Sequence, residues 1–420
     1  MKVLISGTAG AGGWPAPDCG CASCARVTPG RRPTSVVLDV SVAPDGPLVP
    51  DGPVAFGGSV RLPLSGPLPP GYRASPGPDG LTVTTPGGRR VLHAASSPSY
   101  PYDESSYGES SYDERDGQVE GADDVEEALD LVLLDVLDRP ERLGDLRRRG
   151  LVGERTHVVT VDVDHRVPTE AELTRRAALW GVRVVPDGTV VDTSEPPPAQ
   201  APPPRRTLLL GGSRSGKSAE AELRLAAEPE VLYVATGPSG DGDPEWLRRV
   251  RAHRDRRPAH WRTAETTDLA GLLRSADTPL LIDGLGTWVA AVFDECDAWP
   301  EETGEGGRDD RDSGDSGDSG DSGDSGDSGD SGDNKNGEGG RDGRDGRDTV
   351  AARCDDLVAA WRQTRARVVA VSDEVGLGVV PGTASGRMFR DTLGRLNQRL
   401  ALESEDVTLV VAGRLLPLPI

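Results

Sequence analysis

Gly211-Gly-Ser-Arg-Ser-Gly-Lys-Ser218 follows an apolar run, Thr207–Leu210, and opens a segment with helical periodicity, Ser218–Ala227. The eight residues match G-x-x-x-x-G-K-[ST] in the strand–loop–helix context that a phosphate-binding loop requires. Glycines let backbone N–H groups surround a phosphate, and the helix N-terminus adds partial positive charge. We expect Lys217 to neutralise the β- and γ-phosphates and the Ser218 hydroxyl to bind Mg²⁺. The rest of the loop would contact the nucleotide: Gly211, Gly212, Ser213, Arg214, Ser215 and Gly216.

The lysine content of the chain supports this interpretation over a chance glycine turn. The sequence carries 44 Arg but only three Lys, at positions 2, 217 and 335. One of the three stands where the motif needs a compact ammonium, a place that a planar guanidinium fits poorly.

Beyond the loop, strand and helix patterns alternate to the end of the chain. This alternation predicts an α/β fold of the P-loop NTPase type, with a mostly parallel sheet flanked by helices. The expected strands are Thr207–Leu210, Val231–Ala235, Pro279–Asp283, Arg367–Ser372 and Val407–Ala412. The expected helices are Ser218–Ala227, Glu245–Arg254, Asp268–Ser275, Val350–Arg365 and Gly386–Leu402.

Leu280-Leu-Ile-Asp283 is an apolar strand that ends in a carboxylate, as a Walker-B strand does. Asp283 would bind Mg²⁺ directly or through water. The alternative is an ordinary buried strand with a capping aspartate, and the preceding phosphate loop favours the metal-binding interpretation.

His253 lies among four arginines, at positions 251, 254, 256 and 257. Guanidinium groups bind phosphate in a bidentate manner, and their charge keeps a nearby imidazole neutral and therefore nucleophilic. A neutral histidine beside a phosphate site can attack phosphorus. The alternative is a histidine on the surface of a basic helix end.

From Thr207 onward, the chain resembles the bifunctional adenosylcobinamide kinase/adenosylcobinamide-phosphate guanylyltransferase family of cobalamin biosynthesis. Five segments, which occur in the same order as in that family, carry the resemblance. The segments are Gly211–Ser218, Leu232-Tyr-Val-Ala-Thr236, Arg257-Pro-Ala-His-Trp-Arg-Thr-Ala-Glu265, Asp373-Glu-Val-Gly-Leu-Gly-Val-Val-Pro381 and Phe389-Arg-Asp-Thr-Leu-Gly-Arg-Leu-Asn-Gln-Arg-Leu400.

The resemblance implies a transferase with two reactions. A nucleoside triphosphate (ATP or GTP) phosphorylates a corrinoid, and GMP is then transferred from GTP through a guanylylated histidine, which aligns with His253. His260 would be structural, packed by Trp261. The resemblance also implies a homo-oligomer, in particular a trimer. Further GTP contacts would come from Ala235, Thr236, Gly237, Arg254, Asp255, Arg256, Arg257, Glu265 and Asp283.

Two positions depart from the family pattern and bear on the corrinoid contacts. Asp373 stands where the family usually has Asn, and Gly382 where it usually has an acidic residue. Apart from these departures, two other functions stay open: a P-loop small-molecule kinase that never uses His253, and a non-catalytic nucleotide-binding regulatory module whose extra domain binds a partner.

Near the N-terminus, Cys19, Cys21 and Cys24 form a C-x-C-x-x-C motif. Closely spaced thiolates suit a tetrahedral Zn²⁺ that takes one more, distant ligand; three free thiols in a turn are the alternative. The segment is similar to the opening of metallo-β-lactamase-fold proteins that carry an extra zinc site. No H-x-H-x-D-H cluster is present, and Val161-Asp-Val-Asp-His165 is interpreted as structural. This resemblance implies a shortened, catalytically silent α+β relative of that fold.

We divide the chain into residues 1–195 (the metallo-β-lactamase-like domain), a Pro-rich linker at 196–204 and the kinase/guanylyltransferase domain at 205–420. In the first domain we expect strands at Lys2–Ser6, Ser35–Val42, Arg89–Leu92, Asp130–Val136, His157–Val161 and Val182–Val185, and a helix at Glu170–Leu179. Low-complexity stretches at 96–120 and 301–348 are expected to be disordered; the second contains seven Ser-Gly-Asp repeats.

The net charge of −22 argues against a nucleic-acid or membrane-surface partner. Half of it lies in residues 301–348, which hold 17 acidic and 6 basic residues. No stretch of about 20 apolar residues predicts a membrane span, and the N-terminus has no signal-peptide pattern. Five Cys do not form a disulfide scaffold, so we expect a cytoplasmic protein whose partners are small molecules.

Overall fold

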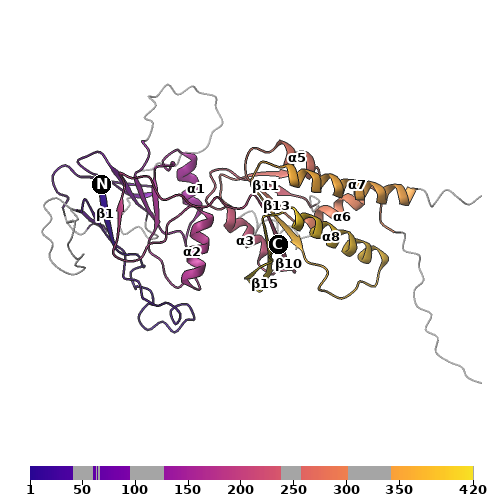
Figure 1. Ribbon diagram of the computed structural model, residues 1–420, viewed down its shortest axis with the longest axis horizontal. Coiled ribbons are helices and arrows are strands. Elements are labelled where there is room, and N and C mark those ends of the chain that lie inside the picture. Colours follow the sequence, from indigo (N-terminus) through magenta and orange to yellow (C-terminus); the bar gives the residue numbers. More distant parts are fainter. Residues whose placement is uncertain are drawn as a thin grey trace, which may run out of the picture.

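The computed structural model describes residues 1–40, 60–62, 64, 67–94, 127–237, 257–300 and 342–419. Figure 1 shows two regions in one elongated molecule, with the N-terminal β-sheets at one end and the C-terminal α/β region at the other. Helices α1 (Glu141–Arg148) and α2 (Glu170–Leu179) lie where the two regions meet.

The N-terminal region contains two sheets. The first has the order β3-β2-β1-β9 and is antiparallel; its strands are Val60–Leu62, Ser35–Leu38, Lys2–Gly7 and Thr189–Asp192. The second has the order β4-β5-β6-β7-β8; its strands are Arg73–Gly77, Gly80–Thr84, Arg90–Ala94, Leu131–Leu134 and His157–Thr160. Side chains from both sheets share one apolar core, which makes the pair a β-sandwich.

The two helices cover the outer face of the second sheet. Leu143 and Leu146 of α1 and Ala177 of α2 pack against a separate apolar cluster on strands β6 to β8. Helix α2 begins after Thr169, whose hydroxyl accepts a hydrogen bond from the Glu172 backbone N–H and so caps the helix.

The C-terminal sheet has seven strands in the order β12-β11-β13-β14-β10-β15-β16. Every pair is parallel except β15–β16, so the strand–helix alternation predicted this arrangement correctly. In chain order the strands are Arg206–Gly211, Leu232–Ala235, Arg262–Glu265, Leu280–Asp283, Val368–Asp373, Asp406–Val411 and Arg414–Pro417, which are β10 to β16.

Helices cover both faces of this sheet. Helix α3 (Lys217–Leu225) packs on one face through Ala221 and Leu225. The larger core lies on the other face, under helices α5, α6, α7 and α8, which span Leu269–Ser275, Leu285–Glu295, Asp342–Gln363 and Ala384–Leu402.

The N-terminal region contacts the C-terminal region through α2 and α3. Arg175 of α2 pairs with Glu220 of α3 at 2.9 Å, and Glu220 also pairs with Arg224 at 2.9 Å. The Trp180 indole N–H donates to the Leu223 carbonyl at 2.7 Å. Helix α3, which follows the phosphate loop, is therefore held against the N-terminal region by a partly buried charge network.

Two expectations are corrected by the structure. Val182–Val185 is not a strand: only Arg183 pairs with β8, because Val182 and Val185 turn into two different cores. Helix α7 begins at Asp342 rather than Val350, so residues 342–348 are helical. Gly346 permits this, since a Cβ there would lie 2.5 Å from the Cys296 carbonyl oxygen.

Several expectations fall outside the described residues, namely the helix at 245–254 and the low-complexity stretches at 96–120 and 301–341. Residues 196–204 link β9 to β10 without helix or strand. Within the described part of the chain, no helix combines the length and apolar character of a membrane span.

Candidate functional site

The phosphate loop joins β10 to α3, as its sequence predicted. A Cβ at Gly211 would lie 2.5 Å from Ser215 Oγ and 2.7 Å from the Val410 carbonyl oxygen, so only glycine fits there. Gly216 begins α3 with a φ of +100°, a conformation that side-chain-bearing residues rarely adopt. The curvature of the loop thus depends on these two glycines.

Lys217 is the first residue of α3. Its Nζ lies 2.8 Å from Asp373 Oδ1 and donates to the Gly212 carbonyl at 3.1 Å. The ammonium group is therefore directed over the loop, where the β- and γ-phosphates of a nucleotide would lie.

Ser218 and Asp283 meet from separate elements. The Ser218 hydroxyl donates to Asp283 Oδ1 at 3.0 Å, and the Tyr233 hydroxyl donates to Asp283 Oδ2 at 2.8 Å. A hydroxyl beside a carboxylate is an oxygen donor set of the kind that Mg²⁺ prefers. Both residues were predicted from sequence as metal-binding groups, and the fold brings them together.

The carboxyl ends of the neighbouring strands meet at the same sheet edge. In the register, Ala235 stands opposite both Asp283 and Glu265. Thr236, the next residue, donates through Oγ1 to the Gly284 carbonyl at 2.7 Å. The predicted nucleotide contacts Ala235, Thr236, Gly237 and Glu265 therefore lie at the same sheet edge as the loop, with β13 and β14 between them and β10.

Arg257 is the one member of the arginine cluster within the described residues. Its guanidinium lies 3.3 Å from the centroid of the Tyr233 ring, a cation–π contact. His253, Arg254, Asp255 and Arg256 lie outside the described residues, so the structure does not place the predicted nucleophile.

Tyr233 is a site residue that sequence reasoning missed. It is 5% exposed, and burial raises the pKa of its phenol, so the hydroxyl stays protonated and acts as a donor. The only sequence signal was a phenol inside the apolar segment Leu232–Ala235, because a buried tyrosine hydroxyl needs a polar partner. Asp373 was noted in the sequence only as a departure from a family pattern.

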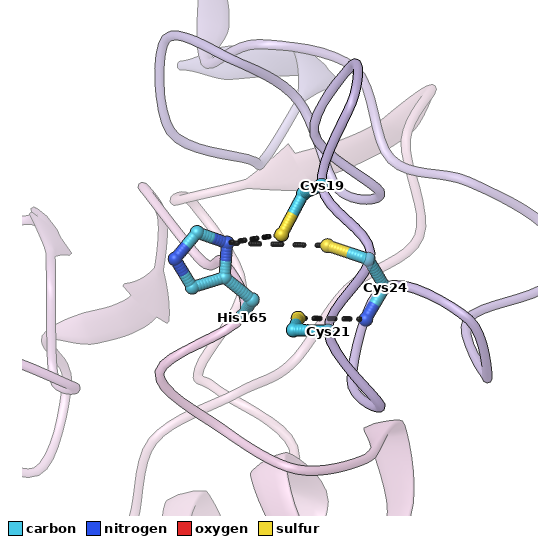
Figure 2. A group of neighbouring side chains, drawn as sticks. All are labelled: Cys19, Cys21, Cys24 and His165. Carbon is cyan, nitrogen blue, oxygen red and sulfur yellow. Dashed lines mark hydrogen bonds between the residues drawn. The ribbon is translucent and has the colours of Figure 1, made fainter.

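The N-terminal cysteines form a second cluster, drawn in Figure 2. Sγ of Cys19 and Sγ of Cys24 lie 3.8 and 3.9 Å from His165 Nδ1. The ligand atoms of these residues and Cys21 all lie within 4.8 Å of one another. A hydrogen bond from the Cys24 backbone N–H lowers the pKa of the Cys21 thiol, which favours the metal-binding thiolate.

His165 brings a ring nitrogen to the three thiols, in the position of the fourth ligand that the sequence could not name. Its interpretation as a merely structural residue is corrected by this position. The two segments are held together at Ser23, whose hydroxyl donates to the Val167 carbonyl at 2.6 Å and accepts from the Trp14 indole at 3.1 Å. A separation of 141 residues between Cys24 and His165 hid the cluster from spacing arguments.

Comparison with known proteins assigns the C-terminal region. Residues 207–418 match the family described as cobinamide kinase / cobinamide phosphate guanyltransferase. The bifunctional adenosylcobalamin biosynthesis protein CobU of Salmonella typhimurium is 34% identical over 216 residues, which cover 48% of this chain and 93% of the relative. CobP of Pseudomonas aeruginosa, which bears the same description, is 36% identical over 217 residues, or 50% of this chain and 94% of the relative.

The match begins at the first strand of the C-terminal sheet and ends just after the last one, so it covers the phosphate loop, Asp283 and Asp373 together. The chain belongs to the cobinamide kinase / cobinamide phosphate guanyltransferase family.

Proposed function

We propose that this chain is an adenosylcobinamide kinase and adenosylcobinamide-phosphate guanylyltransferase of cobalamin biosynthesis that uses ATP and GTP. The observation that carries the proposal is the phosphate loop inside the matched region, with Lys217 directed over it and Ser218 beside Asp283. The order of the two reactions is phosphorylation followed by GMP transfer.

In the first reaction, the corrinoid hydroxyl oxygen forms a bond to the γ-phosphorus of the nucleotide. The bond from that phosphorus to the bridging oxygen breaks, the nucleoside diphosphate leaves, and the hydroxyl proton passes to solvent. Lys217 neutralises the phosphate charge, and the loop N–H groups position it. Ser218 and Asp283 would hold Mg²⁺, whose charge stabilises the phosphates.

In the second reaction, the imidazole of His253 forms a bond to the α-phosphorus of GTP and pyrophosphate leaves. The phosphate of the first product then attacks that phosphorus, which releases the histidine and yields adenosylcobinamide-GDP. The role of His253 rests on the family resemblance. Contacts to GTP by Ala235, Thr236, Gly237, Arg254, Asp255, Arg256, Arg257 and Glu265 are part of the same proposal.

Labelling with α-³²P-GTP tests the histidine intermediate. We expect an acid-labile, alkali-stable adduct that is absent from H253A. H260A is the matched control, because His260 is occupied with the Glu228 carbonyl at 3.3 Å. Phosphorylation without an adduct would indicate a kinase that does not transfer nucleotide. Nucleotide binding without turnover of adenosylcobinamide would indicate a regulatory module.

We propose that the cysteine cluster holds a structural Zn²⁺. Tetrahedral zinc with bonds of about 2.3 Å to sulfur and about 2.0 Å to nitrogen needs ligand atoms roughly 3.5–3.8 Å apart. Cys19 and Cys24 already stand at 3.8 and 3.9 Å from the His165 nitrogen. Four ligands with no open position suit a structural rather than a catalytic metal.

Metal analysis of the purified chain tests the zinc site. We expect about one zinc per chain, lost in C24S and in H165A, and kept in C354S, where a buried cysteine of the other region is changed. Full zinc content in H165A would contradict the fourth ligand.

The β-sandwich with helices on one outer face supports our proposal that residues 1–195 are a shortened metallo-β-lactamase-like domain. We also propose a homo-oligomer, a trimer by resemblance, and a cytoplasmic location where ATP and GTP are available. Light scattering on the full chain would test the trimer, and a monomeric mass would contradict it.

A further inference from the structure

Asp373 occupies a central place in the C-terminal sheet. It is the last residue of β14, which lies between the phosphate-loop strand β10 and the Asp283 strand β13. In the register it stands opposite Gly211. Its carboxylate therefore lies at the middle of the site, between the loop and the proposed metal ligands.

The end of β14 is held by hydrogen bonds from α8, and α6 passes close to the Asp373 carboxylate. Asn397 of α8 donates through Nδ2 to the Asp373 carbonyl at 3.0 Å and accepts at Oδ1 from the Ser372 hydroxyl at 2.6 Å. A Cβ at Gly286, in the first turn of α6, would lie 2.9 Å from Asp373 Oδ2. Helix α8 thus holds the backbone at Asp373, and the missing side chain at Gly286 leaves room for the carboxylate beside Lys217.

The ion pair and the nucleotide require the same ammonium group. Lys217 is only 13% exposed and lies 2.8 Å from Asp373 Oδ1, whereas the carboxylate is 44% exposed. A triphosphate in the loop needs Lys217 for its β- and γ-oxygens and would bring like charge close to Asp373. The triphosphate therefore competes with the Asp373 carboxylate for the same ammonium group, whose three N–H donors the two must share.

We propose that Asp373 is a positioning residue that holds Lys217 in the empty site, yields it to the incoming triphosphate, and thereby lowers nucleotide affinity. The ion pair keeps the lysine extended over the loop when no phosphate is there. Each binding event exchanges a carboxylate for phosphate oxygens on the same nitrogen. The inference uses the proposed function only for the identity of the nucleotide.

Equilibrium binding to D373N tests the affinity. Because a partly exposed ion pair contributes about 1 kcal/mol, we expect fluorescent GTP and ATP analogues with Mg²⁺ to bind D373N about fivefold more tightly than the wild type. E374Q is the matched control: it removes the same charge one residue away, where Glu374 Oε1 accepts a hydrogen bond from the Gly376 backbone N–H at 2.8 Å. We expect its affinity to stay within about twofold of the wild type.

Equal or weaker binding by D373N would overturn the inference, as would an equal gain in E374Q, which would indicate a general charge effect. Absence of nucleotide binding by the wild type would instead refute the proposed function. In turnover, we expect D373N to lower the KM for the nucleotide without raising kcat.

The scarcity of lysine gives a second, structural readout. With lysine labelled at ¹³Cε, the full chain gives signals from Lys2, Lys217 and Lys335 only. K217R identifies the Lys217 signal. We expect it to move in D373N and, in the wild type, on addition of nucleotide, while the other two stay in place. A Lys217 signal that is unchanged in D373N would refute the ion pair in solution.

Discussion

Replacing Tyr233 with phenylalanine removes one oxygen atom from the site and leaves the ring. The lost hydroxyl donates to Asp283 Oδ2 at 2.8 Å, while Asp283 Oδ1 accepts from Ser218. A hydrogen bond to a charged group contributes about 1.5–3 kcal/mol, and outer contacts to metal ligands typically change metal affinity by about 10- to 100-fold. We expect Y233F to raise the Mg²⁺ concentration for half-maximal kinase activity by at least about tenfold.

Comparing two variants separates the role of the Tyr233 hydroxyl from that of its aromatic ring. Y233F keeps the aromatic face that Arg257 covers at 3.3 Å, whereas Y233L removes it as well. Kinase and GMP-transfer rates measured across a Mg²⁺ titration should show the metal defect in both variants. A further loss of about 0.5–1 kcal/mol in GMP transfer is expected in Y233L alone. An unchanged Mg²⁺ dependence in Y233F would refute the idea that Tyr233 positions Asp283.

Three further predictions concern stability. His93 is 3% exposed, and neither ring nitrogen has a hydrogen-bond partner among the described residues. Burial lowers the pKa of its imidazole to about 4. Between about pH 6.5 and pH 4 the ring is therefore neutral in the folded chain, whereas in the unfolded chain it binds a proton. The free energy of unfolding should therefore decrease as the pH is lowered from about 6.5 to about 4. Calorimetry should show that H93L, compared with the wild type, becomes more stable by about 2 kcal/mol when the pH is lowered from 7.5 to 5.0. A stability difference that does not change with pH would contradict this. E220A removes one of the two carboxylates that pair with the buried Arg224 and leaves Asp406 as the other. It should lower the free energy of unfolding by about 1.5–3 kcal/mol in urea titrations, and a loss under about 0.5 kcal/mol would contradict this. G211A should lower both the Tm and the affinity for nucleotide, because the added Cβ would lie too close to the Val410 carbonyl oxygen. At Gly212 no described atom lies within 4 Å of an added Cβ, so G212A should keep the wild-type Tm. The same Tm in both variants would contradict the close contact at Gly211.

The sequence predicted well those features that are written in contiguous residues. Strands β10, β11, β13, β14 and β15 were predicted because each is an apolar run between polar or glycine residues. Strand β12 was missed because its residues Arg262–Glu265 are mostly exposed, and it is a strand only through its pairing with β11. Helix α1 was likewise missed; its apolar face is short and is defined by the sheet that it covers.

By itself, the sequence determined the phosphate loop, the strand that ends in Asp283 and the family, because a loop of eight residues and an apolar strand are local patterns whose chemistry depends on near neighbours. Only the tertiary structure decided which distant groups meet: His165 with the cysteines, Tyr233 with Asp283, and Asp373 with Lys217. In the C-terminal sheet, strand order sets the last two meetings, since β11 lies beside β13, and β14 lies between β10 and β13 although it follows both in the chain. The order is fixed by packing of whole elements on both faces of the sheet, which no single stretch of residues encodes.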